Sequence, residues 1–247
     1  KLNRVGYFKD VSFNVHKGEI VGLTGLVGAG RTEVVEAMFG ITKLESGKVY
    51  LEGKEVKIKQ PSDAMDLGIG LLPEDRQKSG LIMTWGLGRN VTLSTLKNYA
   101  KHGWLDEKKE RETAKKYLEE VDTKAVTIFD PGSSLSGGNQ QKVVVAKTLV
   151  QDLKVIIMDE PTKGVDVGAK AEIYDIMGQL AQKGYGVILI SSEMPEILGM
   201  SDRIVVMCNG KVTGELSREE ATQERILEFA MEKTKTNLAK GVKEAGK

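Results

Sequence analysis

The chain has 247 residues, of which 40% are hydrophobic and 29% charged, and its formal net charge is +1. This length suits one large α/β domain or a core with a smaller subdomain, and the near-zero charge gives no field that would favour DNA or RNA. The single cysteine, Cys208, excludes an internal disulfide and a thiolate zinc cluster, and the distant His16 and His102 are interpreted as surface residues rather than metal ligands.

No apolar run is long enough to span a bilayer, and the N-terminus lacks the hydrophobic region of a signal peptide. We therefore expect a soluble, intracellular chain that reaches a membrane only through a partner. Lys1 leads almost directly into a strand-like segment, so we expect this sequence to be a domain of a longer polypeptide.

The first part of the chain predicts short strands and helices in alternation. They are a strand at 11–15, a strand at 19–23, a helix at 32–39 that Gly40 ends, a hairpin of 48–51 and 56–58 around Glu52-Gly53, a helix at 61–67 and a strand at 69–72. The character changes over 76–131, where 107–120 is dense in charge with apolar residues at helical spacing, and we interpret this region as an inserted helical subdomain.

The core pattern then resumes. It predicts helices at 137–150, 167–181 and 219–231 and strands at 155–158, 186–190, 204–207 and 211–214. This alternation predicts a mainly parallel sheet with helices on its faces. The core would comprise about 1–75 and 132–231 of a domain spanning 1–231, followed by a frayed, Lys-rich tail at 232–247.

A glycine-rich loop, GLVGAGRT, stands between a predicted strand and a predicted helix. It comprises Gly25, Leu26, Val27, Gly28, Ala29, Gly30, Arg31 and Thr32, with Glu33 next. Glycines let backbone amides close around phosphate oxygens, the helix N-terminus adds its positive end, and the Thr32 hydroxyl would bind magnesium. The alternative is an ordinary strand–helix turn.

Two positions depart from the usual phosphate loop. Arg31 stands where the pattern has Lys, and Glu33 stands where many such loops carry a hydroxyl residue. Because Arg is longer, planar and forked, it cannot occupy the point that a Lys ammonium takes between the β- and γ-phosphates. We expect nucleotide affinity to survive in part and transition-state stabilisation to suffer.

The segment VIIMDEP predicts a buried strand with Asp159 and Glu160 at its carboxyl end, where ligands bind in open α/β sheets. Asp159 is placed to bind magnesium, and Glu160 to orient or deprotonate an attacking water. The alternative is a strand that ends in a charged turn. In LSGGNQQK, Ser136 is a natural N-cap, and with Gly137 and Gly138 it forms an anion site at a helix N-terminus; the alternative is a helix cap alone.

The glycine-rich loop, LSGG and the Asp-Glu strand, in this order, resemble the ATPase domain of an ABC transporter from about Val11 to Met231. The resemblance implies an α/β P-loop NTPase with a mainly parallel core sheet, a small antiparallel β part and a helical subdomain, which uses ATP and Mg²⁺. Two such domains would pair head to tail around ATP. Ser136, Gly137 and Gly138, supported by Gln140, would then face the partner's γ-phosphate, and Asp166 would lie in the loop that crosses to the partner.

Finer features narrow the resemblance to the C-terminal ATPase half of bacterial monosaccharide importers of the ribose, galactose or xylose type. They are LSGGNQQK, PEDRQKSGL (73–81), PTKGVDVGAK (161–170) and SSEMPEILGMSDRI (191–204). This implies an N-terminal ATPase half on the same polypeptide, a membrane permease, indirectly a sugar-binding protein, and a peripheral position on the cytoplasmic face of the inner membrane. Importers of autoinducer-2 or nucleosides look similar, so the cargo stays open.

Two more positions depart from the family pattern: Glu74 replaces a Gln that touches magnesium and the attacking water, and Ser192 replaces a His that contacts the γ-phosphate. With Arg31, these predict an impaired nucleotide site beside an intact donated signature loop, whereas Glu160 favours slow hydrolysis over none. The adenine-stacking aromatic is expected near the N-terminus, where Tyr7 and Phe8 stand a few residues late.

An apolar segment, 81–87, is hypothesised to line the groove that receives a helix of the permease; packing within the helical subdomain is the alternative. Two other functions stay open. One is a regulatory module that binds ATP without turnover, and the other is an ABC-type ATPase with no membrane partner. The modest insertion and near-zero charge disfavour the latter, and LSGGNQQ excludes a P-loop kinase.

Overall fold

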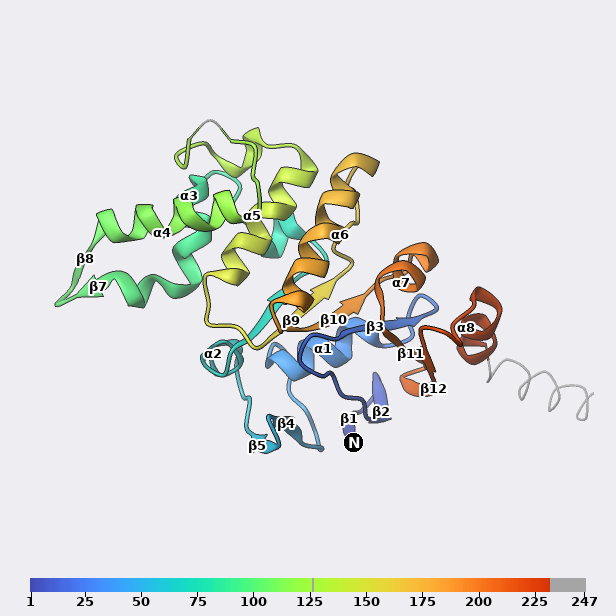
Figure 1. Cartoon of the computed structure of the whole chain (residues 1–247). Coiled ribbons are helices and arrows are strands. Elements are labelled where there is room, and N and C mark those ends of the chain that lie inside the picture. Colours follow the sequence, from blue (N-terminus) through green and yellow to red (C-terminus); the bar gives the residue numbers. More distant parts are fainter. Residues whose placement is uncertain (126, 232–247) are drawn as a thin grey trace, which may run out of the picture. The chain divides into compact units, whose positions relative to one another are not determined.

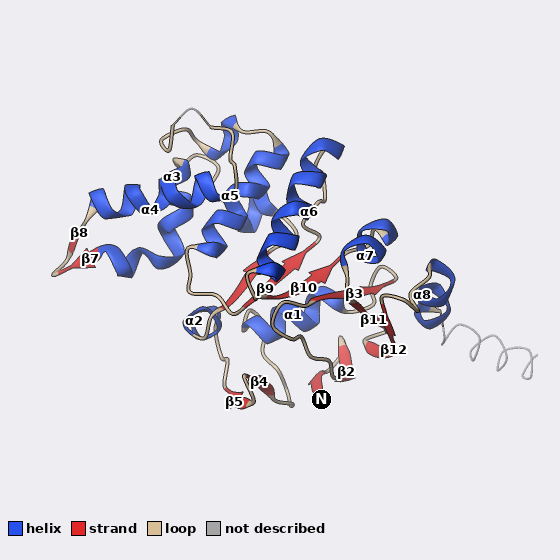
Figure 2. Ribbon diagram, in the orientation of Figure 1, coloured by secondary structure: helices blue, strands red, loops and turns tan. Residues whose placement is uncertain are grey.

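The computed structural model describes residues 1–125 and 127–231, so the predicted tail at 232–247 lies outside the described residues. The chain divides into two compact units, one formed by Lys1–Ala64 with the residues from Ile188 onward, the other by Met65–Val187. Figure 1 labels the elements, and Figure 2 distinguishes helices from strands.

The first unit combines short strands with helices that contact them. Its elements are β1 (Leu2–Arg4), β2 (Phe8–Val11), β3 (Ile20–Gly25), α1 (Arg31–Phe39), β4 (Val49–Leu51), β5 (Lys54–Val56), most of α2 (Pro61–Asp66), the end of β10 (Gly186–Ile190), α7 (Met194–Met200), β11 (Arg203–Cys208), β12 (Lys211–Ser217) and α8 (Gln223–Ala230). The strand order is β12-β11-β3-β10. α1 and α7 contact β3, and α8 contacts β11 and β12.

β3 and β11 form the parallel centre of this unit. Their register runs from Val21 opposite Arg203 to Gly25 opposite Met207, while β12 pairs antiparallel with β11. Both central strands are almost wholly buried, which explains their continuous apolar runs. The predicted hairpin is present as β4 and β5, but its second strand lies at 54–56 rather than at the predicted 56–58. Glu52 and Gly53, with φ of 51° and 78°, join the strands, as a two-residue hairpin turn requires.

One predicted strand is wrong. The alternation at 11–15 predicts a strand there, but β2 ends at Val11 after pairing antiparallel with the short β1. Beyond that point the backbone carbonyl of Asn14 accepts a hydrogen bond from the Arg203 side chain, and the segment has no strand assignment. An alternating pattern records which side chains turn inward, not whether a neighbouring strand is present.

The second unit contains the helical region. Its elements are β6 (Ile69–Leu72), a single π-helical turn (Arg76–Gly80), α3 (Leu87–Thr92), a 3₁₀ segment (Leu93–Tyr99), β7 (Ala100–Lys101), β8 (Trp104–Leu105), α4 (Glu107–Glu120), a second 3₁₀ turn (Gly132–Ser134), α5 (Gly137–Leu149), β9 (Val155–Asp159) and α6 (Val167–Gln182). β6 and β9 pair in parallel, from Ile69 opposite Val155 to Leu72 opposite Met158. α3, α4 and α5 pack against one another.

The predicted fold class is therefore confirmed: the main strand pairs are parallel, and small antiparallel pairs accompany them. The β7–β8 hairpin and α7 were not predicted. His102 and Gly103, both with positive φ, turn the hairpin, and His102 and His16 are exposed as interpreted. Among the residues described, no helix is both long and apolar enough to cross a membrane.

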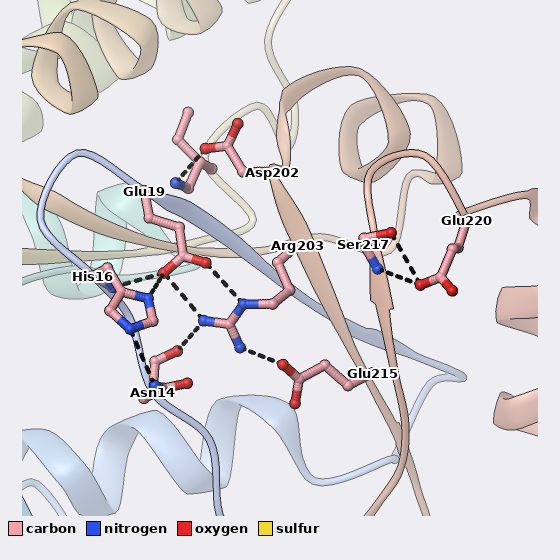
Figure 3. Close-up of polar contacts among 9 residues, drawn as sticks. Asn14, His16, Glu19, Asp202, Arg203, Glu215, Ser217 and Glu220 are labelled. Carbon is pink, nitrogen blue, oxygen red and sulfur yellow. Dashed lines mark hydrogen bonds and ion pairs between the residues drawn. The ribbon is translucent and has the colours of Figure 1, made fainter.

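Arg203 ties three segments of the first unit together (Figure 3). Its guanidinium donates to both carboxylate oxygens of Glu19 at 2.8 and 3.1 Å, to the carbonyl of Asn14 at 2.9 Å and to Glu215 at 2.6 Å. The Arg203 and Glu19 side chains are only 17% and 14% exposed. Burial raises the pKa of Glu19, but hydrogen bonds from Arg203 and His16 outweigh it and leave that pKa below its ordinary value.

We predict that Arg203→Met lowers the free energy of unfolding by about 2–3 kcal/mol, because it leaves a mostly buried carboxylate without its main donor. Since the pKa of Glu19 is lower in the folded state, its stabilisation is present above the unfolded pKa of about 4.3 and is lost as pH falls through the folded value. Urea denaturation should therefore show the largest difference from the unsubstituted chain at pH 7 and a smaller one below about pH 4.

The matched control is Arg218→Met, whose side chain is 58% exposed and lies 3.9 Å from the Asp202 carboxylate. It should cost less than about 1 kcal/mol, as exposed ion pairs do. Equal losses for the two variants would contradict a structural role for the Arg203 cluster.

Candidate nucleotide site

The glycine-rich loop leaves β3 at a point where a side chain has no room. Gly25 has φ of 154°, and a Cβ there would lie 2.2 Å from the carbonyl oxygen of Met207. Gly28 and Gly30 follow with φ of 80° and 94°. These left-handed conformations are easy for glycine and costly for other residues, so the loop geometry explains all three glycines.

The head of α1 fits a phosphate group. α1 has nine residues and begins at Arg31, with Gly30 as an N-cap that makes no side-chain cap hydrogen bond. α3 and α7 likewise have no side-chain cap, whereas α4, α5, α6 and α8 are each capped by a side chain: Asp106, Ser136, Asp166 and Thr222. First-turn amides have no acceptor within their own helix, so the head of α1 suits an anion such as the triphosphate of ATP. Leu26 and Val27, 49% and 93% exposed, form the open side of the loop.

Arg31 does not extend into solvent. Its side chain is 9% exposed, and its Nη1 donates to the carbonyl oxygen of Ser191 at 2.8 Å. Thr24 Oγ1 donates to the same carbonyl at 3.3 Å, and the adjacent Ser192 is exposed. The structure thus brings Arg31 next to the segment that carries Ser192, although the two are far apart in sequence. Sequence analysis missed Ser191, whose contribution is a backbone atom that no side-chain pattern marks.

Of the two N-terminal aromatic residues, only Tyr7 presents its ring to solvent. It is 51% exposed, Phe8 is 4% exposed, and the guanidinium of Arg4 lies 3.9 Å from the Tyr7 ring centroid. The Tyr7 carbonyl lies beside Gly30, where an added Cβ would be 3.2 Å from it. An open groove of about 470 Å³ runs along residues 3–9 with Glu45 and Asn209. Tyr7 therefore stands next to the glycine-rich loop.

In the second unit, β9 carries its two acidic residues to the strand end as predicted. Asp159 is its last residue and is 3% exposed. Glu160 has φ of 47°, in the left-handed region that non-glycine residues seldom adopt. Such backbone strain clusters at functional sites, where it fixes the direction of a side chain. A buried carboxylate followed by a strained one is a donor set that suits Mg²⁺ and a water molecule.

Glu74 has a partner that sequence analysis missed. Its Oε1 accepts a hydrogen bond from Lys163 Nζ at 2.6 Å, with the two side chains 42% and 62% exposed. The hydrogen bond and the charge of Glu74, followed by attraction from Glu160 and Asp159, raise the pKa of Lys163. The two residues are 89 positions apart, so no local pattern links them.

The signature loop has the local structure that its sequence predicts. Ser136 caps α5 by accepting from the amide of Asn139 at 3.4 Å. A Cβ at Gly138 would lie 2.3 Å from that of Ala169, so α6 permits only glycine there. Gln140 is 4% exposed, and its Nε2 donates to Gly132 O and Leu135 O, both at 3.1 Å. In this structure, therefore, the Gln140 amide supports the loop from within.

Asp166 also has a local role. Its Oδ1 accepts from the amide of Ala169 at 3.0 Å and so caps α6. The predicted site residues thus form two groups. The glycine-rich loop and Ser192 belong to the first unit, and Glu74, Asp159, Glu160, the signature loop and Asp166 belong to the second.

Solved ATP-binding cassettes share this fold. The chain matches the ATP-binding cassette MJ1267 of an ABC transporter with a TM-score of 0.78 and 25% identity, over 92% of this chain and 95% of that one. The dimeric ABC transporter cassette MJ0796 matches with a TM-score of 0.73 and 22% identity, over 88% and 95%, which is a likeness of fold. A P-loop cassette is therefore the class that the fold and the loops define.

The sequence profile of the ABC transporter family matches residues 8–163, more than half of the chain. The chain belongs to the ABC transporter family, as its motifs predicted.

Among named relatives, the ribose import ATP-binding protein RbsA of Oceanobacillus iheyensis is 46% identical over 229 residues, which is 93% of this chain and 46% of the relative. RbsA of Lacticaseibacillus paracasei is 50% identical over 93% of this chain and 46% of the relative. RbsA of Caldanaerobacter subterraneus subsp. tengcongensis is 52% identical over 90% and 45%. The chain spans about half the length of these curated relatives.

We predict that Gly25→Ala lowers the free energy of unfolding by roughly 2–4 kcal/mol, because the added methyl meets a strand carbonyl in a strained conformation. Binding of a fluorescent ATP analogue should weaken with it. Gly178→Ala is the matched control: Gly178 lies within α6 with nothing within 4 Å of an added Cβ. That change should stabilise by up to about 1 kcal/mol, since Ala is the better helix former. Urea denaturation measures both changes in the free energy of unfolding. A Gly25→Ala variant more stable than the unsubstituted chain would refute the close contact between Gly25 and the Met207 carbonyl.

Proposed function

We propose that this chain is the ATP-binding, energy-coupling part of an ATP-driven sugar importer, with ribose or a related monosaccharide as the cargo. The observation that carries the proposal is the glycine-rich loop at the end of β3, which leads into a helix whose head has no side-chain cap. The relatives named as ribose import ATP-binding proteins supply the cargo class.

The residues of the two units take separate roles in this proposal. Gly25, Leu26, Val27, Gly28, Ala29, Gly30, Arg31, Thr32 and Glu33 form the segment that holds the triphosphate. Thr32 and Asp159, with Glu74, would hold Mg²⁺, which neutralises phosphate charge and orients the γ-phosphate. Glu160 orients the attacking water and accepts its proton.

We propose that ATP bound at this chain's own glycine-rich loop is hydrolysed slowly. Arg31 donates its Nη1 to the Ser191 carbonyl, so the direction of its guanidinium is set by that acceptor as well as by any phosphate it meets. A serine hydroxyl at 192 is too short to replace an imidazole on the γ-phosphate. In this proposal Glu74 would add a negative charge to the site, which Lys163, at 2.6 Å from its carboxylate, would partly offset. The result would be ATP binding with low activity in the isolated chain.

The partners follow from the same proposal. The chain would pair head to tail with a second ABC ATPase domain and offer Ser136, Gly137, Gly138 and Asp166 to its ATP. That the chain spans about half of its relatives favours an N-terminal ATPase half of the same polypeptide as this partner.

A permease would place the assembly on the cytoplasmic face of the inner membrane, with a sugar-binding protein acting on the permease. In the segment 81–87, Leu81 and Leu87 are buried and Trp85 is 44% exposed. Trp85 is therefore the residue proposed to meet the permease, while the leucines pack inside the helical region.

A second candidate is a regulatory module that binds ATP and pairs without turning it over. The contact from Arg31 to the Ser191 carbonyl favours it, because a guanidinium engaged with the protein contributes less to transition-state charge. Glu160, with its strained backbone, favours the hydrolytic candidate instead.

We predict that the chain binds Mg²⁺-ATP and hydrolyses it slowly, at a rate above that of Glu160→Gln, which serves as the blank. Steady-state phosphate release and equilibrium binding of a fluorescent ATP analogue are the two measurements. Binding with turnover equal to the blank would select the regulatory candidate. Absence of both in the folded chain would overturn the proposed function.

We further predict that Arg31→Lys combined with Ser192→His raises kcat by about tenfold or more, since a compact ammonium and an imidazole restore two contacts to the γ-phosphate. Each single change should give less than the pair. The control is Arg218→Lys, at an exposed arginine, which should leave kcat unchanged. A matching Ser201→His change is not suitable because Ser201 is fully buried. A double variant no faster than the unsubstituted chain would contradict the impaired-site interpretation.

A further inference from the structure

Arg76 joins three segments of the second unit that are far apart in sequence. Its Nη1 donates to the carbonyl oxygen of Lys163 at 2.6 Å and its Nη2 to that of Gly164 at 3.0 Å. Its Nε lies 3.4 Å from Oε1 of Gln140, near the head of α5. One planar guanidinium thus connects the segment after β6, the loop after β9 and the signature helix.

The loop after β9 also makes a side-chain contact with the segment that carries Arg76. Lys163, whose carbonyl accepts from Arg76, donates its Nζ to Glu74 at 2.6 Å. Residues 74 and 76 therefore hold residue 163 at both its backbone and its side chain. Two contacts to one residue fix the orientation of the loop as well as its distance from the segment that carries residues 74 and 76.

The head of the signature helix leaves no space around this contact. A Cβ at Gly137 would lie 2.8 Å from Arg76 Nη2 and 3.0 Å from the carbonyl of Gly164. Gly164 itself has φ of 65°, so the loop turns in a conformation that favours glycine. Glycine at 137 thus permits the close approach of the guanidinium, and glycine at 164 permits the turn of the loop.

The segment that carries Arg76 makes further contacts with α5 at Gly80. Asp75 caps the π-helical turn at 76–80, and at the end of that turn the Gly80 carbonyl accepts from Lys147 at 2.7 Å. A Cβ at Gly80 would lie 2.9 Å from Val144. Gln140, Val144 and Lys147 are spaced at i, i+4 and i+7, so one face of α5 contacts the whole turn.

We propose that Arg76 is a positioning residue that locks the loop at 161–166 to the segment at 73–81 and to the head of α5. Asp166 and Ser136, which this chain is proposed to offer to a partner domain's ATP, would then keep one relative arrangement. A force on the segment at 73–81 would move both together. The role of Arg76 at a partner's ATP site rests on the proposed function. Its role in holding the loop at 161–166 does not.

Arginine is specifically suited to this position. Its fork reaches two carbonyls and an amide oxygen at once, whereas a Lys ammonium is a single point of charge on a flexible stem. Arg76→Lys should therefore keep part of the lock and Arg76→Met none. Arg111→Met is the matched control, because Arg111 is 54% exposed and contacts Glu107 at 2.7 Å and the Phe129 ring, whose centroid lies 5.5 Å away.

The first test is hydrogen–deuterium exchange in the 247-residue chain without ATP, read at the amides of Lys163 and Val165. These amides donate to Glu160 O and Thr162 O, both at 3.1 Å. Arg76→Met should accelerate their exchange by about tenfold or more, because it removes two hydrogen bonds from a charged donor. Arg76→Lys should fall between, and Arg111→Met should match the unsubstituted chain. Equal exchange in Arg76→Met and Arg111→Met overturns the proposal.

Lys163→Met provides a second variant that removes the side-chain contact alone. Its side chain is 62% exposed, so the fold should tolerate the change. We expect faster exchange of the same amides by a smaller factor than in Arg76→Met, and no acceleration would overturn the side-chain half of the lock.

The second test separates this inference from the proposed function. In ATP hydrolysis, Arg76→Met should lower kcat by about tenfold while KM for ATP stays within about twofold, because the glycine-rich loop is untouched; partial recovery in Arg76→Lys is expected. An unchanged kcat overturns the role at a partner's ATP site. If the unsubstituted chain neither binds nor hydrolyses ATP, the proposed function fails, whereas the exchange result still decides whether the lock exists.

Discussion

The geometry of the glycine-rich loop depends first on a close contact between two parallel strands. Gly25 ends β3 directly opposite Met207 of β11, and a side chain there would overlap the Met207 carbonyl. This contact fixes the point at which the chain leaves the sheet. The left-handed turns at Gly28 and Gly30 and the start of α1 follow from that point, so the direction of the helix head is set by strand packing rather than by the loop alone.

Two of the residues that depart from the family pattern, Arg31 and Glu74, have a nearby partner in the structure. Arg31 is engaged by the Ser191 carbonyl, and Glu74 by Lys163. From the sequence, Glu74 appears as a charge that would repel phosphate. With an ammonium at 2.6 Å, much of that repulsion is offset, because the pair presents a dipole rather than a net charge. Under the proposed function, Arg31 would therefore be a greater obstacle to turnover than Glu74.

Much of the fold could be predicted because the core strands are short apolar runs, as in β6, β9 and β10. The signature helix and its Ser136 cap were predicted for the same reason: the information is local. The misplaced strand at 11–15 shows the limit, since alternation gives burial but not pairing. The Glu74–Lys163 pair and the Arg76 contacts could not be predicted, because they join segments more than 60 positions apart through backbone carbonyls and exposed side chains.

The signature helix, α5, carries a buried charged residue that has several partners. Lys142 is 1% exposed, and its ammonium donates to the Asp122 carbonyl at 2.8 Å and lies 2.7 Å from Glu172 of α6. That ammonium lowers the pKa of Glu172. A buried charge of this kind is tolerated only with well-placed partners, so α5 and α6 are held in one arrangement. Ser136 caps α5 and Asp166 caps α6, so the same contacts connect the two helices that these residues cap. Under the proposed function, the two residues offered to a partner's ATP would therefore keep a fixed spacing.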